Sequence, residues 1–437
     1  MEKTLSRPRF AGRAVTAVCG AIALVTLAGC SSRPAGGAAT VAASFDRGHD
    51  AHPEHGASPE RAALRRAVLG PSADVSRTPT PAFDARGRLW LAWVEGRHVL
   101  VSSSKDLGRT FAPAVTVNAV PEDVDANSES RPKIAAGRGG EIYVTYTRLG
   151  ARRYTGDVRF SRSTDGGRTF APPVTLNDDH LDTGHRFDAL AVRPDGTVFV
   201  SWIDKRDLEA AGMHAGAAVY YTVSRDAGRT FEPNRRLASD VCECCRLAPA
   251  FDTDSRLTLA WRAVLPGGVR DHAIGWISRD GSAASPERAT VEGWKIDACP
   301  HHGPSLAISA DGTYHLVWFT GEGPRGAGAF YAFSLDRGRT FSAPRRLGLA
   351  SGEAHGMVVA AGRHVFLAWK QRDEAGSAVY VQRSDDDGVN WSEPEKVLST
   401  SGSSDHPQLT ASPTGVFLSW FTTKEGYRLA PLVPPAS

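Results

Sequence analysis

One short phrase, Ser-x-Asp-x-Gly-x-(Thr/Asn)-(Phe/Trp), occurs five times along this chain of 437 residues. The five copies begin at Ser104, Ser163, Ser224, Ser334 and Ser384. A phrase that recurs along a chain indicates stacked supersecondary units, none of which can bury its apolar face alone. The repeat therefore restricts the chain to a repeat architecture before any chemistry is considered.

Each copy of the phrase has the composition of a hairpin turn. The aspartate accepts hydrogen bonds from nearby backbone N–H groups, the glycine takes a positive φ, and the aromatic residue packs the turn onto the sheet. The phrase is identified as the Asp-box of the bacterial neuraminidase repeat, so the chain resembles the sialidase-like β-propellers. This resemblance implies that five aspartates are structural and lie away from any active site: Asp106, Asp165, Asp226, Asp336 and Asp386.

A second repeat predicts the number of blades. Seven segments combine a short strand, a glycine turn and an alternating apolar strand that ends in an aromatic residue. These aromatic residues are Trp93, Tyr146, Trp202, Trp261, Trp318, Trp369 and Trp420. Their spacing of 51 to 59 residues suits a four-stranded blade with its loops. We predict an all-β propeller of seven four-stranded blades; six blades, the number in catalytic sialidases, is the alternative.

The last blade lacks sequence for its outer strand. After Trp420 the chain has room for one more strand, so the fourth must come from elsewhere. Residues 66–70, just ahead of the first blade, resemble the outer-strand sequences at 346–349 and 396–398. We expect this N-terminal segment to close the ring and to protect the sheet edges of the terminal blades.

The N-terminal residues predict export and a lipid anchor. A basic stretch and an apolar run precede Leu27-Ala28-Gly29-Cys30, which resembles a lipobox. We predict a signal peptide at 1–29, lipidation of Cys30, a flexible tether at 30–63 and the propeller at 64–437. By resemblance to proteobacterial lipoproteins, Ser31 after the cysteine implies the periplasmic face of the outer membrane, with surface exposure left open. An ordinary secretory signal is the alternative.

The charge of the chain excludes one class of partner. The formal net charge is +3, and the first 29 residues alone account for it with Lys3, Arg7, Arg9 and Arg13 against Glu2. The predicted mature protein is therefore close to neutral. Nucleic-acid binding requires a basic footprint, so we expect no nucleic-acid partner.

Cysteines and histidines concentrate in the segments that lead into the innermost strands of blades three to seven, here called the lead-in segments. The residues concerned are His185, Cys242, Cys244, Cys245, Cys299, His301, His302, His355 and His406. In sialidase-like propellers these segments form the functional face, so we expect the side chains to converge at the axial mouth. Thiolates and imidazoles favour copper and zinc. We predict a copper or zinc site in a non-hydrolytic binding protein of the cell envelope, with a metal-trafficking or other envelope protein as partner.

Disulfides are the competing interpretation of the cysteines. Envelope cysteines are usually oxidised, and four of them predict up to two bridges, with Cys299 joined to one member of the 242–245 group. Adjacent Cys244 and Cys245 pair only with strain, so three cysteines within four residues are poorly placed to form disulfide bonds. A disulfide and a histidine-based metal site are also compatible with each other.

Hydrolysis of sialosides is the rival activity that the resemblance implies. Arg131, Arg186 and Arg246 occupy matching lead-in segments and could clamp a substrate carboxylate, with Asp188 as the acid/base. The Phe/Tyr-Arg-Ile-Pro phrase of the family is absent, and no tyrosine stands at an innermost strand start to serve as nucleophile. We therefore rank an exo-α-sialidase second and a glycan-binding or scaffold propeller third.

Overall fold

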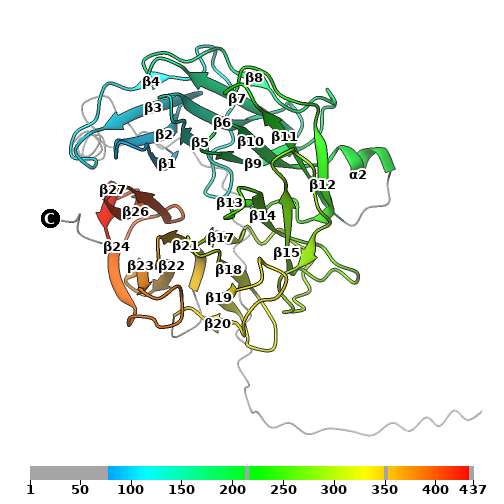
Figure 1. Cartoon of the computed structure of the whole chain (residues 1–437), viewed down its shortest axis with the longest axis vertical. Coiled ribbons are helices and arrows are strands. Elements are labelled where there is room, and N and C mark those ends of the chain that lie inside the picture. Colours follow the sequence, from blue (N-terminus) through cyan, green and yellow to red (C-terminus); the bar gives the residue numbers. More distant parts are fainter. Residues whose placement is uncertain (1–76, 212–215, 349–352, 433–437) are drawn as a thin grey trace, which may run out of the picture. The chain divides into compact units, whose positions relative to one another are not determined.

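The computed structural model describes residues 77–211, 216–348 and 353–432, which form a β-propeller (Figure 1). Seven antiparallel sheets surround a common axis, and each sheet runs in simple sequence order from its innermost strand outward. Six sheets have four strands, and the seventh has three within the described residues. The prediction of an all-β, seven-bladed propeller is confirmed, and the six-bladed alternative is wrong.

The innermost strands line the axis and range from four to nine residues. They are β1 (Arg77–Phe83), β5 (Lys133–Ala136), β9 (His185–Val192), β13 (Ala248–Phe251), β17 (Ser305–Ile308), β21 (Glu353–Ala361) and β25 (Gln408–Ser412). Each contacts the innermost strand of the next blade, and β25 contacts β1, which closes the ring.

The second strands carry the core of each blade. They are β2 (Leu89–Glu95), β6 (Ile142–Leu149), β10 (Val198–Asp204), β14 (Leu257–Arg262), β18 (Tyr314–Thr320), β22 (His364–Asp373) and β26 (Gly415–Thr422). All seven aromatic residues that define the second repeat lie on these strands, and none is more than 2% exposed. The repeat therefore marks the same structural position in every blade.

The outer half of each blade is more exposed. The third strands are β3 (His98–Ser104), β7 (Gly156–Ser163), β11 (Ala217–Ser224), β15 (His272–Ile277), β19 (Gly328–Ser334), β23 (Gly376–Ser384) and β27 (Gly426–Pro431). The fourth strands are β4 (Val115–Thr116), β8 (Val174–Thr175), β12 (Arg235–Val241), β16 (Glu287–Arg288), β20 (Arg345–Arg346) and β24 (Glu395–Thr400). One short helix, α2 (Arg206–Ala211), follows β10.

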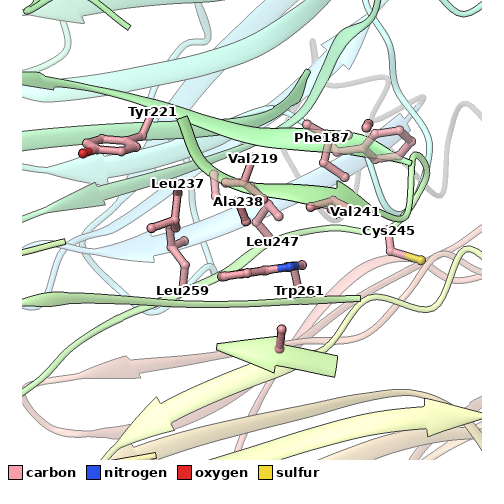
Figure 2. Packing of buried hydrophobic residues seen from close by; sticks show 14 of the residues in the cluster. Phe187, Val219, Tyr221, Leu237, Ala238, Val241, Cys245, Leu247, Leu259 and Trp261 are labelled. Atoms are coloured by element: carbon pink, nitrogen blue, oxygen red, sulfur yellow. The ribbon is translucent and has the colours of Figure 1, made fainter. Parts of the chain in front are cut away.

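Neighbouring blades are held together by apolar side chains packed between their sheets. Figure 2 shows the group between blades 3 and 4, in which Val219 and Tyr221 of β11 face Leu259 and Trp261 of β14. Cys242, Cys244 and Cys245 belong to the same buried group. Three of the predicted metal ligands are therefore anchored directly in the core between two blades.

The Asp-boxes join the third strand to the fourth. In the first box, Asp106 accepts hydrogen bonds from the Thr110 backbone N–H at 2.8 Å, the Thr110 hydroxyl at 2.6 Å and the Ser104 hydroxyl at 2.7 Å. Gly108 has a φ of +83° in the turn. The four other boxes repeat the threonine or asparagine contacts to their aspartate. These aspartates thus stabilise the outer turns.

Several N-terminal predictions fall outside the described residues. They concern the signal peptide, Cys30, the tether and the closing segment at 66–70, and they stay predictions. In the described part of the chain, no helix has the length and apolar character needed to cross a membrane. Blade 7 ends at β27, which pairs only with β26 among the described residues, as the predicted shortage of sequence requires.

Candidate functional site

Three innermost strands begin with a β-bulge at the face where the lead-in segments lie. The pairing register of β1, β9 and β21 with the adjoining second strand shifts near their starts. Each bulge contains a non-glycine residue with positive φ, namely Thr78 at +50°, Phe187 at +56° and His355 at +52°. A bulge redirects side chains at the cost of regular pairing. His185 and His355 therefore lie inside β9 and β21 rather than ahead of them.

Three cysteines form a compact buried group between β12 and β13, here called the thiol cluster: Cys242, Cys244 and Cys245. The Cys242 Sγ atom lies 3.8 Å from Sγ of Cys244 and 3.8 Å from Sγ of Cys245. None of the three residues is more than 4% exposed. All four cysteines in the described part of the chain are free thiols. The expected disulfide alternative is not present in this structure.

The sulfur separations have a specific chemical meaning. A disulfide requires an S–S distance of about 2.05 Å. Two thiolates that share a tetrahedral metal at about 2.3 Å are separated by about 3.8 Å. The separations from Cys242 to its two neighbours therefore match the edges of a metal–thiolate site. The arrangement could hold one ion without large movement of the chain.

Cys299 adjoins the thiol cluster from blade 5. Its thiol is exposed, and a hydrogen bond with Cys244 lowers its pKa to about 7. The pKa of Cys242 is lowered by hydrogen bonds from Cys244 and Cys245 and, more weakly, by the charge of Arg262. Cys242 and Cys299 are thus disposed toward the thiolate form, which is the form that binds metal. A hydrogen bond with Cys242 raises the pKa of Cys244, and burial raises that of Cys245, so these two thiols would lose their protons on binding a metal ion.

Arg262 is a buried cation next to the thiol cluster. The backbone N–H of Cys242 donates to the Arg262 carbonyl at 2.9 Å, and the arginine side chain is fully buried. The guanidinium donates to three backbone carbonyls, those of Arg270, His302 and Phe319, at 2.8 to 3.0 Å. It has no carboxylate partner among the described residues. Buried charges are normally paired, so an anion is expected nearby.

A second group lies at the propeller axis and consists of three histidines and a glutamate: Glu129, His302, His355 and His406. The rings of His302 and His355 stack with centroids 4.2 Å apart, and those of His355 and His406 with centroids 3.3 Å apart. The histidines come from blades 5, 6 and 7. Burial lowers the pKa of all three, that of His302 to about 4, so the rings are neutral at pH 7.

Glu129 is the functional residue that the sequence reasoning missed. It is 2% exposed and is held by hydrogen bonds from the backbone N–H groups of Arg246 and Gly303 at 2.9 and 3.0 Å. Its Oε1 lies 3.1 Å from Nδ1 of His406. The residue stands in the lead-in segment of blade 2, two positions before Arg131, but a single glutamate there belongs to no motif.

Two of the predicted ligands do not join either group. His185 is buried in blade 3, where its Nε2 lies 3.0 Å from Asp179 and 3.8 Å from Asp204. Arg206 also bonds both aspartates, which makes this an ion-pair network. His301 is exposed and lies near Phe187, with ring centroids 6.5 Å apart. The single nine-residue site expected from the sequence is therefore divided in the structure into separate groups.

The three arginines of the hydrolase interpretation all have internal carboxylate partners. Arg131 lies 3.3 Å from Asp405, Arg186 lies 2.6 Å from Asp125, and Arg246 lies 2.6 Å from Glu129. Their side chains are 3%, 15% and 12% exposed. A substrate carboxylate would have to displace these partners before the guanidinium groups could bind it.

The other residues of that interpretation are also engaged. Asp188 accepts a hydrogen bond from the Thr145 hydroxyl at 2.6 Å, and burial raises the pKa of its carboxyl group. Tyr146 donates its hydroxyl to Glu122, and burial followed by this contact raises its pKa well above the usual value. A tyrosine with a raised pKa is a weaker nucleophile at neutral pH, not an activated one.

Comparison with known proteins gives matches only among solved structures. No family model and no curated protein sequence matches the chain. An ulvan lyase of polysaccharide lyase family PL25, bound to -[GlcA(1-4)Rha3S]-, is 12% identical with a TM-score of 0.53, over 84% of this chain and 94% of the lyase. The chain shares the β-propeller fold.

A sialidase shows a weaker likeness of the same kind. The Hadza microbial sialidase Hz136 is 15% identical with a TM-score of 0.47, over 77% of this chain and 74% of the sialidase. At these identities the likeness concerns fold and not activity. The β-propeller architecture expected from the sequence is present in the structure, while the chemistry has to be argued from this chain's own side chains.

Proposed function

We propose that this propeller is a non-hydrolytic binding protein that holds one transition metal ion on the thiol cluster, with copper preferred over zinc. The observation that carries the proposal is the pair of 3.8 Å separations between Cys242 Sγ and the two neighbouring sulfurs. Three free thiols in a buried pocket, with a fourth thiol beside them, supply the soft ligands that both ions accept.

Copper is preferred because of the ligand type and its spacing. Soft thiolates select Cu(I), whereas structural zinc sites more often use paired Cys-x-x-Cys segments. Here Cys242, Cys244 and Cys245 come from one four-residue segment, and only Cys299 comes from another blade. Three ligands from one turn suit the low coordination number of Cu(I), and Cys299 is placed to act as a further or exchangeable ligand.

The buried Arg262 supports a negatively charged cluster. A guanidinium without a carboxylate partner among the described residues needs an anion in the low-dielectric interior. Three thiolates around Cu(I) carry a net charge of about −2, and around Zn²⁺ about −1. Either ion would leave the negative charge that Arg262 requires, whereas three neutral thiols would not.

The non-hydrolytic part of the proposal rests on the arginines. Because Arg131, Arg186 and Arg246 each pair with an internal carboxylate, the face lacks a free carboxylate clamp in its described part. We expect no release of fluorophore from a synthetic sialoside. Turnover that is lost in Arg186→Ala would instead favour the exo-α-sialidase.

The cellular setting is proposed from the sequence alone. Cys30 would carry the lipid that anchors the protein at the outer membrane, and residues 31–63 would tether the propeller. A metal site in this location would receive its ion from, or deliver it to, an envelope protein partner. Glycan binding is a less supported role for the same face.

Metal analysis of the full chain tests the proposal. After reduction and anaerobic loading with Cu(I), we expect about one copper per chain. The variant with Cys242, Cys244 and Cys245 all changed to serine should lose it. Ala263→Ser, which places the same side chain elsewhere in the same buried group, is the control and should retain the copper. A chain free of metal after loading in both reduced and oxidised forms would refute the proposal.

A further inference from the structure

The three axial histidines are brought together from three separate blades. His302 leads into β17, His355 lies at the bulge of β21, and His406 leads into β25. The ring stack places His355 between the other two, with centroid separations of 4.2 and 3.3 Å. His302 and His406 are more than a hundred residues apart in sequence. They become neighbours because the ring of blades closes.

Two nitrogen atoms in this stack have no hydrogen-bond partner, and a third is poorly satisfied. Within the described part of the chain, the Nδ1 atoms of His302 and His355 are buried and unsatisfied. Nδ1 of His406 is buried as well, and its 3.1 Å contact with Glu129 Oε1 lacks the direction of a good hydrogen bond. More than nine in ten buried polar groups in proteins are hydrogen-bonded, so each exception calls for an explanation. Three imidazole nitrogens with unmet or poorly met hydrogen bonding in one place point to a common missing partner.

Glu129 adds a carboxylate oxygen aimed at the same point. Its Oε1 lies 3.1 Å from Nδ1 of His406 and 4.0 Å from Nδ1 of His355. One ligand atom from each of these three residues lies within 4.8 Å of the other two. The glutamate, His355 and His406 thus already converge on a volume that one ion could occupy.

Hydrogen bonds from Arg246 and Gly303 fix the orientation of the Glu129 carboxylate. Two backbone N–H groups hold Oε2, and Arg246 Nη1 donates to Oε1 at 2.6 Å. A carboxylate oxygen has about two acceptor sites, so Arg246 leaves one site on Oε1 available. Ligating carboxylates in metal sites are typically hydrogen-bonded in this way by outer residues that fix their direction.

We propose that Glu129, His355 and His406, with His302 beside them, form a second metal site that is separate from the thiol cluster and takes a borderline divalent cation, Zn²⁺ or Cu²⁺. Imidazole with carboxylate is a harder ligand set than three thiolates, so the two sites differ in the ions that they prefer. Binding requires His355 and His406 to turn out of their stack, because ligands around a metal diverge from one another.

This inference uses no residue of the thiol cluster and stands independently of the proposed function. The probe is Co²⁺, a spectroscopic substitute for Zn²⁺, added to the full chain with Cys242, Cys244, Cys245 and Cys299 changed to serine. We expect about one Co²⁺ per chain, with d–d bands and no thiolate-to-cobalt charge transfer. Binding should be lost when His355→Gln and His406→Gln are added, and retained with His364→Gln, a surface histidine on β22.

The outcomes separate the two sites. If the serine variant is folded by circular dichroism but binds no Co²⁺, the second site is refuted while the thiol cluster stands. If it binds Co²⁺ while the wild type takes up no copper after loading in both reduced and oxidised forms, the thiol proposal fails and the axial site stands. Should the serine variant not fold, Zn²⁺ is added to the wild type and histidine ring NMR signals are followed. Unmoved signals of the axial rings would then refute the second site.

Discussion

Arg246 holds the carboxylate of Glu129 with both its backbone and its side chain. The backbone N–H donates to Oε2 at 2.9 Å, and Nη1 donates to Oε1 at 2.6 Å. The two residues are 117 positions apart in sequence and come from the lead-in segments of blades 4 and 2. The pair therefore links two non-adjacent blades across the axis.

Removing the arginine side chain should destabilise the propeller. Arg246→Met leaves Glu129 buried and without its cation, and such a change costs about 3–5 kcal/mol. Adding Glu129→Gln should recover part of that loss, because the buried charge is then gone. Urea denaturation followed by tryptophan fluorescence gives the free energies of unfolding.

An exposed ion pair provides the control for this prediction. Arg337 and Asp254 pair at the surface with side chains 54% and 50% exposed, so Arg337→Met should change the free energy of unfolding by less than about 1 kcal/mol. Equal losses for Arg246→Met and Arg337→Met would contradict the structural role given to the axial pair.

Replacing Arg262 should weaken metal binding at the thiol cluster. Arg262→Met removes the buried positive charge that stabilises the thiolates, and we expect a loss of about 10- to 100-fold in Cu(I) affinity. Arg262→Lys should retain part of the affinity, because it keeps the charge but not the three carbonyl contacts. Competition with a Cu(I) chelator measures both variants.

The control for Arg262 lies in the same blade. Arg256, in the turn between β13 and β14, pairs with Asp252, and its side chain is 29% exposed. Arg256→Met should leave the Cu(I) affinity unchanged. If Arg262→Met binds copper as tightly as Arg256→Met, the guanidinium is not the counterion of the cluster.

His185 predicts a fall in stability above neutral pH. Its burial would lower the pKa, but the hydrogen bond that it donates to Asp179 and the charge of Asp204 raise it above the ordinary value near 6.5. A raised pKa in the folded state means that the stabilisation is present below pH 6.5. It is lost as the pH rises through the folded value. Melting temperatures should therefore decline above neutral pH, and His185→Gln should flatten that decline.

His315 has the opposite sign and serves as the comparison. Burial lowers its pKa to about 4, so its contribution changes between about pH 4 and 6.5 and not above. His315→Gln should alter the profile on the acid side only. A decline above pH 7 that is the same in His185→Gln as in the wild type would contradict the assignment.

The fold was predictable because its signals are local. An Asp-box is complete within eight residues, and the aromatic residue on each second strand is buried by its own blade and the preceding blade of the ring. Trp93 in the first blade and Trp420 in the last are therefore buried in the same way as the aromatic residues of the blades between them. Sequence distance does not weaken a signal that every blade repeats.

The site was predictable only in part, because it depends on the paths of non-repeated loops. The sequence predicted that the cysteines and histidines share one face, but it did not show which of them are in contact. His185 pairs with Asp179 and Asp204 within blade 3, whereas the bulge in β21 turns His355 toward the axis. Glu129 was missed because a single glutamate in a loop has no distinguishing pattern until the ring brings it beside His406.

The edge of blade 7 predicts a role for the segment at 66–70. Strand β27 pairs only with β26 among the described residues, whereas every other third strand has a fourth beside it. A groove of about 640 Å³ lies next to this edge, and both apolar residues, such as Phe366 and Leu432, and charged residues, such as Arg383 and Glu395, line it. An open strand edge promotes self-association. We expect the N-terminal segment to cover it.

Deletion of residues 64–70 should therefore lower the melting temperature and cause concentration-dependent association. Deletion of seven tether residues, 50–56, changes the chain length equally and should have neither effect. Differential scanning calorimetry and sedimentation velocity measure the two properties. If both deletions leave a monomer with the wild-type melting temperature, residues 64–70 do not close blade 7.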